Sequence, residues 1–419
     1  MSRGLTAVSP LLVFLLVYLV SSLVAGDFYK VPVSAVFLLA GVYGIAVAEG
    51  PLTQRLATFS RGAGHPNVLL MIWIFLRAGA FAQTARSIGA VDATVSLMLS
   101  VLPPRWLLSG LFVIACFLSM AMGTSVGTIV ALMPIGAGIA AECGIPVPYM
   151  AALIVGGSFF GDNLSFISDT TIAATRAAGC EMRDKFRANL RIVLPAFLAV
   201  TVIYFIRGGQ LSAAPAQSAA GWYLALPYLL IITLSLCGLN VTGVLASGIA
   251  AVALLGFLTG RLGWVSWLGA VGEGVAGMSD LIIVTLLAGG LLELIRAGGG
   301  LDLIIRSLSK GIRGRREAEL AIAGIVSLAN LCTANNTVAI ITTGGIAHDI
   351  AERFGVPARK TASLLDTFSC LVQGLIPYGA QLLMAAGLAE ISPAAIIPFL
   401  YYPFLMGLCA IVSILFDRR

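Results

Sequence analysis

The chain has 419 residues, of which 59% are hydrophobic and only 11% are charged, and its mean hydropathy is +1.01. Soluble domains carry about 25% charged residues, so this composition excludes a soluble globular protein and predicts one that crosses a membrane several times. The net charge of +6 is then expected to reflect membrane topology rather than nucleic-acid binding.

Several functional classes lack the residues that they need. The seven cysteines are scattered, with no C-x-x-C or histidine-rich setting, so neither a zinc site nor a disulfide framework is expected. The sequence has no phosphate loop and no dinucleotide fingerprint, which argues against ATP-driven transport and against a bound cofactor. It also has no constellation of nucleophile and base, so we do not expect an enzyme.

The N-terminus allows two interpretations. Arg3 precedes an apolar run from Leu11 to Val24 that ends near Ala25 and Gly26, as a cleaved signal peptide would. A second apolar segment, residues 33–48, follows after a short loop, and for this reason we favour a retained first span.

Apolar runs of about 20 residues can cross the bilayer as helices. Residues 106–141 and 317–352 each begin and end on one predicted side and carry a polar motif between, so we expect two helical hairpins that dip in and return. Residues 89–103 and 299–311 are expected to be interfacial arms. The predicted crossings are residues 5–25, 32–50, 67–88, 150–175 and 190–207, then 222–238, 241–260, 279–297, 361–386 and 395–416.

The second half of the chain repeats the first at an offset of about 210 residues. Chance similarity between apolar helices is the alternative, and the matched Gly, Arg, Asp and Pro residues disfavour it. The pairs are Gly79 with Gly289, Arg86 with Arg296, Gly89 with Gly299, Asp92 with Asp302, Gly144 with Gly355, Pro146 with Pro357 and, at offset 209, Thr124 with Thr333.

Loop charges indicate how the two repeats are oriented, because Lys and Arg accumulate in cytoplasmic loops. Loop 176–191 contains five basic residues, including Lys185, whereas its mate 387–402 has none. Loop 306–316 is also basic, and its mate 96–106 has only Arg105. Corresponding loops therefore lie on opposite sides, which predicts inverted repeats and places both termini in the cytoplasm.

The fold expected is an all-α integral membrane protein of two inverted-topology repeats, with about ten transmembrane helices, two re-entrant hairpins and two broken helices. The first repeat is residues 1–210, with hairpin 106–141 and broken helix 150–175. The second is residues 211–419, with hairpin 317–352 and broken helix 361–386. We expect it in the cytoplasmic (inner) membrane, in contact with lipid, and leave a homodimer open.

Four polar interruptions, two in each repeat, are candidate binding sites, because unwound backbone at membrane depth is tolerated only where it lines protein or a cavity. Inverted-repeat transporters hold ions and substrates at such breaks. The first interruption, residues 123–128, offers the hydroxyls of Thr124, Ser125 and Thr128. Helix packing through small residues is the alternative interpretation.

The second interruption, residues 161–171, gathers two carboxylates, an amide and four hydroxyls. Hard cations prefer such oxygen ligands, and the glycines at 156, 157 and 161 make an intact helix doubtful here. Ser168 or Asp169 capping the following helix is the alternative, and capping can coexist with ion binding. The candidate ligands are Asp162, Asn163, Ser165, Ser168, Asp169 and Thr170.

The third and fourth interruptions lie in the second repeat. Two adjacent amides in an apolar hairpin are costly unless paired, so they are either ligands or interhelical hydrogen-bond partners. In the fourth, residues 366–381, Gln373 stands opposite Asp162 and the carboxylate, Asp366, lies about two turns earlier, as a site residue or a salt-bridge partner. The candidates are Thr333, Asn335, Asn336 and Thr337 in the third, and Asp366, Thr367, Ser369 and Gln373 in the fourth.

Other polar residues have weaker claims. Arg77 lies within a span, where it could bind an anionic substrate or neutralise a buried Asp. Glu293 is expected to pair with Arg296 at i+3. No proton role is expected of His65 or His348.

Several of these motifs resemble a known family. The string from Gly157 to Thr171, with Gly-Asp-Asn-Leu-Ser at 161–165 and Ser-Asp-Thr-Thr at 168–171, is similar to the signature of the NhaC-type Na⁺/H⁺ antiporters, which belong to an ion-transporter superfamily of inverted-repeat carriers. The hairpin string 123–128, Asp366-Thr367 and Leu-Ile-Pro-Tyr at 375–378 are similar to further family motifs. The resemblance spans most of the chain and implies secondary transport coupled to sodium or protons.

The sequence also departs from the family pattern. Asn163 stands where Lys is expected, Asn335 and Asn336 where many members have an acidic or amide pair, and Arg77 is unusual. These departures leave the substrate open, since members include a malate/lactate exchanger and suspected amino-acid permeases.

The function expected is antiport of Na⁺ or Li⁺ against protons by alternating access. Asp162 and Asp169 would bind Na⁺ or H⁺ competitively, with Asn163 in the Na⁺ shell and Asp366 as a second titrating group, since a buried carboxyl group takes up a proton more readily than one in water. The alternative is a Na⁺- or H⁺-coupled carrier of a small organic acid or amino acid, held by Arg77 and the hairpin tips.

Overall fold

The computed structural model describes residues 2–25, 31–211, 221–309 and 312–416, and over these residues it forms helices and connecting loops without strands. The first half contains α1 (Ser2–Ala25), α2 (Val33–Val47), α3 (Leu52–Ala63), α4 (Pro66–Ser87), α5 (Ala90–Val101), α6 (Pro104–Met122), α7 (Ser125–Glu142), α8 (Val147–Leu164), α9 (Asp169–Ala178) and α10 (Met182–Gly208). The second half contains η1 (Trp222–Ala225), α11 (Leu226–Leu236), α12 (Val241–Leu258), α13 (Trp264–Gly277), α14 (Ser279–Ala297), α15 (Gly300–Ser309), α16 (Arg315–Thr333), α17 (Asn336–Phe354), α18 (Ala358–Leu375), α19 (Ala380–Ala389), α20 (Pro393–Ile396), η2 (Ile397–Phe399) and α21 (Tyr401–Phe416).

The helices are long and apolar enough for the predicted membrane protein. Among the described residues, nine segments have the length and hydropathy to cross a bilayer, and the bent pair 393–399 and 401–416 makes ten if it is one span. Both α8–α9 and α18–α19 count as single broken spans of 32 residues. The expectation of an all-α protein with about ten crossings is confirmed.

The two hairpin tips have the same backbone conformation. Gly123 and Ala334 each follow the first helix of a hairpin in the left-handed region, with φ of +68° and +48°. Thr124 and Asn335 come next, both at φ −148°. Thr124 therefore corresponds to Asn335 at offset 211, and the alignment of Thr124 with Thr333 was wrong by two residues, because small insertions in apolar sequence leave the register ambiguous.

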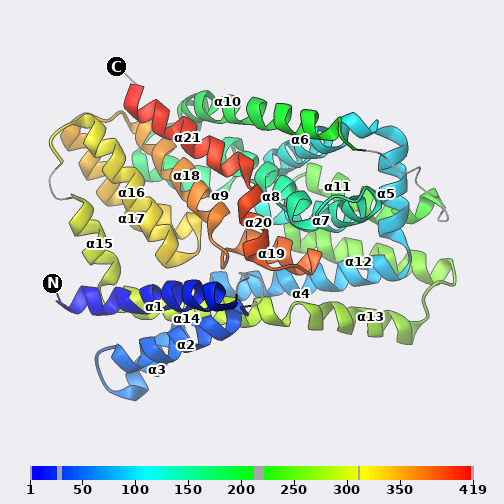
Figure 1. The fold of residues 1–419 in the computed structure, drawn as a ribbon, viewed down its shortest axis with the longest axis horizontal. Helices are drawn as coiled ribbons and strands as arrows, with labels where there is room; N and C mark the ends of the chain where they lie inside the picture. Colours follow the sequence, from blue (N-terminus) through cyan, green and yellow to red (C-terminus); the bar gives the residue numbers. More distant parts are fainter. Residues whose placement is uncertain (1, 26–30, 212–220, 310–311, 417–419) are drawn as a thin grey trace.

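The helices form two bundles, and each bundle draws on both halves of the chain (Figure 1). The first bundle consists of α1–α4 with α11–α14. In it, helices α2 and α3 pack on α14, while helices α12 and α13 pack on α4. The second bundle consists of α6–α10 with α16–α21. In it, helices α6 and α7 pack on α8, while helices α16 and α17 pack on α18. The predicted arms are helices α5 and α15, which link the two bundles at either end; Lys310 and Gly311, at the end of the second arm, lie outside the described residues.

Two helices of the first bundle were missed by the sequence analysis, α3 and α13. Each packs through glycine against a helix of the other half: Gly62 of α3 lies against Gly289 of α14, and Gly274 of α13 lies against Gly79 of α4. A Cβ atom at any of these positions would clash with backbone of the facing helix, so the glycines are required for the close approach.

The two broken helices are interrupted over four residues each, 165–168 and 376–379. The break expected within residues 161–171 is confirmed at 165–168, but the glycines at 156, 157 and 161 do not form it, because α8 continues to Leu164. These glycines serve packing instead: a Cβ on Gly157 or Gly161 would overlap α6. Asp162 and Asn163 therefore occupy the last turn of a helix rather than a loop.

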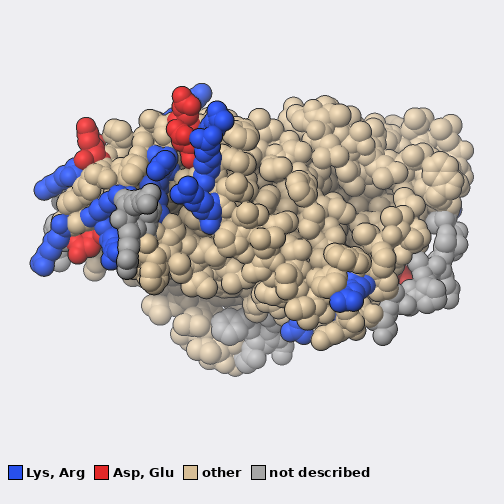
Figure 2. Space-filling view, turned by 90° about the horizontal axis from the view of Figure 1, so that it is seen from above, with Lys and Arg blue, Asp and Glu red and all other residues tan. Residues whose placement is uncertain are grey.

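Basic side chains gather at one end of the molecule (Figure 2, left). Helix α1 begins, and α21 ends, at the same end (Figure 1). Helices α1, α4, α13 and α14 of the first bundle run roughly along the long axis of the molecule (Figure 1).

Candidate functional site

A buried carboxylate meets the first hairpin tip at the end of α8. The Oδ1 atom of Asp162 accepts the backbone N–H of Ser125 at 3.1 Å, and Asp162 is only 4% exposed. Ser125 is the first residue of α7, and the N-terminus of a helix carries partial positive charge from its free N–H groups. The helix end thus compensates part of the charge of Asp162.

A second carboxylate, Asp366 of α18, is held in a buried ion pair. Its Oδ2 atom lies 2.5 Å from Nζ of Lys185 in α10, and the two side chains are 0% and 1% exposed. The Nδ2 atom of Asn189, one turn further along α10, donates to the same Oδ2 at 3.0 Å. A buried charge of this kind is stable only when it is both paired and hydrogen-bonded.

The break after α8 connects the two carboxylates. Thr170 and Thr171 donate their hydroxyls to the carbonyl oxygen of Asp162, at 2.9 and 3.3 Å. The carbonyl oxygen of Asn163 accepts Nζ of Lys185 at 2.6 Å and Nδ2 of Asn189 at 3.0 Å. Because the chain leaves the helix at Ser165, these carbonyls are free of helical partners and point polar groups into the bundle.

The second hairpin tip is joined to the first by two glutamines. Gln373 of α18 donates from Nε2 to the carbonyl of Ala334 at 3.1 Å and to Oε1 of Gln381 at 2.9 Å. Gln381, in the first turn of α19, donates in turn to Oγ of Ser125 at 2.9 Å. One continuous chain of hydrogen bonds therefore runs from the second tip to the first and on to Asp162.

The remaining polar residues of the second tip mostly support local structure. Asn335 caps α17 by accepting the N–H of Val338 at 2.9 Å, and Thr333 donates to the carbonyl of Asn335 at 3.1 Å. Asn336 accepts the N–H of Thr337 at 3.1 Å, and its Nδ2 lies 3.8 Å from Sγ of Cys370. Cys370 Sγ is itself 3.8 Å from Oδ1 of Asp366, which links this tip to the ion pair.

Several buried oxygen atoms in this region accept no hydrogen bond from the described residues. They belong to side chains of α10, α16 and α18, the helices that surround the two carboxylates. Hard cations are bound by carboxylate, amide, hydroxyl and carbonyl oxygens, so unpaired oxygens of these types are available as ligands. The atoms are Asn189 Oδ1, Asn330 Oδ1, Thr367 Oγ1 and Gln373 Oε1.

Not all predicted site residues join this network. Asp169 is exposed at the first residue of α9, apart from the buried pair of carboxylates. Arg77 lies over the ring of Trp73, 5.3 Å from its centroid, and Trp73 is exposed on the outside of α4. Serine and threonine residues make local bonds: Ser168 with Thr170 Oγ1, Thr128 to the carbonyl of Thr124, Ser369 to the carbonyl of Asp366, and Ser165 from the N–H of Ile167.

Lys185, Asn189 and Gln381 are central to the network. Gln381 ends the fourth interruption predicted from the sequence but was not among its candidate ligands, and Lys185 and Asn189 were not assigned to the site. Lys185 was counted as a cytoplasmic loop residue; the structure corrects this, because α10 begins at Met182 and buries the side chain. The available signal was position: Lys185 and Asn189 are four residues apart, on one face of a helix that leads directly from the broken span. Gln381 stands at offset 211 from Thr170.

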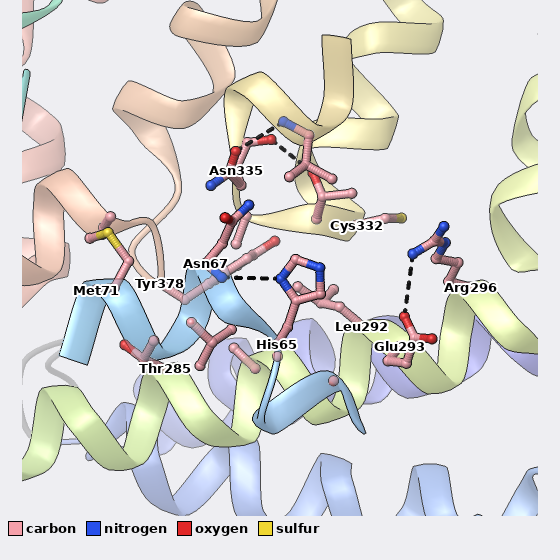
Figure 3. Close-up of a pocket in the computed structure, with 18 of the residues that line it drawn as sticks. His65, Asn67, Met71, Thr285, Leu292, Glu293, Arg296, Cys332, Asn335 and Tyr378 are labelled. Atoms are coloured by element: carbon pink, nitrogen blue, oxygen red, sulfur yellow. Dashed lines mark hydrogen bonds and ion pairs between the residues drawn. The ribbon is translucent and has the colours of Figure 1, made fainter. Parts of the chain in front are cut away.

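A cavity between the two bundles reaches the second hairpin tip (Figure 3). It encloses about 1020 Å³ of space, including solvent at its mouth, between α4 and α14 on one side and the tip with Tyr378 and α19 on the other. His65, which accepts the N–H of Asn67 at 3.3 Å, and the Glu293–Arg296 ion pair, 3.6 Å long, line it. The predicted i+3 pairing of Glu293 with Arg296 is confirmed.

Comparison with known proteins identifies the family. The model of the Na⁺/H⁺ antiporter family matches residues 5–209 and 212–417. The chain is 27% identical over 388 residues to the malate-2H⁺/Na⁺-lactate antiporter of Bacillus subtilis (strain 168), covering 83% of this chain and 81% of the relative. It is 24% identical over 425 residues to the Na⁺/H⁺ antiporter NhaC of Alkalihalophilus pseudofirmus, covering 92% and 89%.

Among solved structures, the YdaH transporter of Alcanivorax borkumensis, described as having an unusual topology, aligns over 97% of both chains with 14% identity and a TM-score of 0.42. The family match extends over almost the whole chain, as the motif resemblance led us to expect. The protein therefore belongs to the Na⁺/H⁺ antiporter family.

Proposed function

We propose that this protein exchanges Na⁺ or Li⁺ for protons across the cytoplasmic membrane by alternating access. The observation that carries the proposal is the pair of buried carboxylates, Asp162 and Asp366, which lie on the two broken helices and are connected through one hydrogen-bonded network. Buried ionisable groups in membrane proteins mark ion pathways, because they are costly without such a role.

The cation site we propose lies between these carboxylates, within the second bundle. The ligands would come from Asp162, Asp366, Asn163 and Thr171, together with the unpaired oxygens of Thr367 and Gln373, and a proton would replace the cation on a carboxylate. Asp169, exposed at the start of α9, would attract cations towards the site. Membership of the Na⁺/H⁺ antiporter family supports this assignment.

Alternating access would come from movement of the second bundle against the first. The cavity at their interface would open the site to one side of the membrane, and a shift of the bundles would close it and open the other. We propose that the repeats are inverted and that the end rich in Lys and Arg faces the cytoplasm, which places both termini there.

The test uses purified protein in proteoliposomes loaded with a pH-sensitive dye. A Na⁺ or Li⁺ pulse is expected to change the internal pH, and choline is expected to have no effect. The absence of a cation-dependent pH change between pH 6 and 9 would rule out the exchange that we propose.

A carrier for a small organic acid is the second candidate. The cavity lies between the two bundles and opens to solvent, and one relative is named as a malate and lactate antiporter. Arg77 would not hold the carboxylate of such a solute, since it lies against Trp73 outside the cavity lining. Two results together would favour this candidate. Proteoliposomes would take up labelled malate, lactate or amino acids, and a Na⁺ pulse without these solutes would leave the internal pH unchanged.

A further inference from the structure

The ammonium group of Lys185 is completely enclosed by oxygen atoms. Its Nζ lies 2.5 Å from Oδ2 of Asp366, 2.6 Å from the carbonyl oxygen of Asn163 and 2.7 Å from Oγ1 of Thr171. A lysine ammonium group has three N–H donors, so these three contacts use all of them. The side chain is only 1% exposed, so these protein oxygens are the groups placed to compensate its charge.

The three acceptors are of the kinds that bind a small hard cation. One is a carboxylate, one is a hydroxyl, and one is a carbonyl freed from helical bonding at the end of α8. They come from three elements, α18, α9 and the last turn of α8, which converge at the break of the first broken span. Half-helix ends and freed carbonyls of this kind hold the coupling ion in inverted-repeat carriers. The ammonium group thus occupies a position with the ligand chemistry of a cation site.

We infer that Lys185 is a tethered competitor of the transported cation: its ammonium group fills the oxygen cage of Asp366, Asn163 and Thr171 when the carrier is empty and is displaced when Na⁺ or Li⁺ binds. The inference rests on the cation transport proposed above. It names the residue that neutralises the empty site and the oxygens that the ion takes over.

Asn189 provides a place for the displaced group. Its Nδ2 already donates to Asp366 and to the carbonyl of Asn163, while its Oδ1 is buried and accepts no hydrogen bond from the described residues. Asn189 lies one helical turn from Lys185 on α10, so the two side chains are neighbours. This free oxygen is the acceptor that we assign to the displaced ammonium group.

This arrangement has a consequence for the transport cycle. An empty carrier without Lys185 would hold Asp366 as an unpaired buried charge, which is strongly destabilising. With Lys185 in the cage, the second bundle can change its exposure without Na⁺, while Asp162 carries the proton that the proposed exchange returns. Lys185 therefore permits the empty carrier to return, at the cost of a weaker apparent affinity for Na⁺.

The test compares thermal unfolding of purified variants in Na⁺ and in choline. Lys185→Met removes the competitor; it is expected to unfold at a lower temperature than wild type in choline and to gain more stability from Na⁺. Its half-saturating Na⁺ concentration is expected to fall at least about tenfold, since apparent affinity scales with the fraction of sites that are free to bind. Lys185→Arg keeps a permanent charge in the cage and is expected to lose the Na⁺-dependent shift.

Two controls separate competition from a structural role. Lys360→Met removes a second buried lysine, which lies in α18 outside the cage and donates to Oγ of Ser413 at 2.6 Å. The half-saturating Na⁺ concentration of this variant is expected to match wild type. The double variant Lys185→Met, Asp366→Asn removes both charges and is expected to lose the enlarged Na⁺ shift. If Lys185→Met does not stay monodisperse, Lys185→Gln is used in the same titrations.

The outcomes are distinct. An unchanged or weaker Na⁺ response of Lys185→Met and Lys185→Gln would overturn the inference and leave Lys185 as a structural partner of Asp366. A second outcome combines two results: the Lys185 variants respond to lower Na⁺ concentrations, but the wild-type protein shows no Na⁺-driven pH change in vesicles. This outcome would support the cage and refute the antiport that we propose.

Discussion

Gly79 of α4 and Gly274 of α13 lie backbone to backbone, so that a Cβ atom on either would overlap the carbonyl group of the other. Gly62 of α3 and Gly289 of α14 make the corresponding contact. These two contacts join helices from opposite halves of the chain, and they hold the first bundle together where lipid provides no hydrophobic driving force between helices.

A side chain at Gly274 is expected to separate α13 from α4. Gly274→Leu should destabilise the protein by about 1–3 kcal/mol or prevent its assembly, as overpacking of a close interface does. Gly272→Leu on the same helix is the control, because no atom lies within 4 Å of its Cβ position. Thermal unfolding in detergent is the measurement, and equal stability of the two variants would contradict the role given to this contact.

Neutralising Asp162 is expected to impair cation exchange more than neutralising Asp169. Asp162 is buried against the N–H of Ser125, whereas Asp169 is exposed. Removing a residue that only supports an ion ligand typically lowers ion affinity about 10–100-fold. Asp162→Asn removes a proposed ligand, so its ion affinity should fall by at least this factor. Initial rates of ²²Na⁺ uptake into proteoliposomes measure the effect. Normal uptake by both variants would show that the ion binds elsewhere.

The hydrogen bonds through Gln381 are expected to couple the two hairpin tips. Gln381→Leu leaves Nε2 of Gln373 with one partner fewer and Oγ of Ser125 without its donor, at a cost of about 1–3 kcal/mol for buried polar groups. In a double-mutant cycle with Gln373→Leu, the two unfolding free energies should not add, because the residues share one bond. Additive values would show that the tips are stabilised independently.

The cavity is expected to admit water-soluble reagents from one side of the membrane. Val338→Cys should react with an impermeant maleimide, while Ala339→Cys, one residue on and fully buried, should not. The background carries Cys237→Ser and Cys332→Ser, because Cys237 is exposed and Cys332 lines the cavity. Burial raises the pKa of the Cys143 and Cys180 thiols, so at pH 7 fewer of them are thiolates and they react slowly. Equal labelling from both sides, or of both variants, would contradict a one-sided cavity.

Much of the architecture was readable from the sequence because membrane helices leave strong signals. Hydropathy marked the spans, and matched Gly and Pro residues marked the internal repeat. Helices α3 and α13 escaped prediction because they are short, at 12 and 14 residues, and α3 carries Arg55 and Arg61 among its apolar residues. Their function in the fold is to present glycine to a distant helix, and this depends on a partner about 200 residues away in the sequence.

The candidate site was only partly predictable for a similar reason. Asp162 and Asp366 stood out as carboxylates within apolar sequence, and both prove to be buried. Lys185 looked like a topology signal because it lies among arginines, and only the packing of α10 on α8 and α18 shows that its side chain turns inward. The three glycines before Asp162 were taken for helix breakers, whereas Gly157 and Gly161 let α6 approach α8 and Gly156 lies against Tyr402 of α21. Glycine permits both close helix packing and helix unwinding, and the sequence alone does not distinguish the two roles.

The exchange of helices between the two bundles also bears on how the chain is made. When the first half leaves the ribosome, α4 has no α13 to cover Gly79, and Asp162 lacks the polar chain that Gln381 completes. Ribosomes add about 5–20 residues per second, so this half waits in the membrane for about ten seconds or more before Gln381 has been made. Insertion of the first ten helices must therefore yield an intermediate that tolerates unpaired polar groups, and it is during this interval that quality-control proteases could distinguish an incomplete carrier from a finished one.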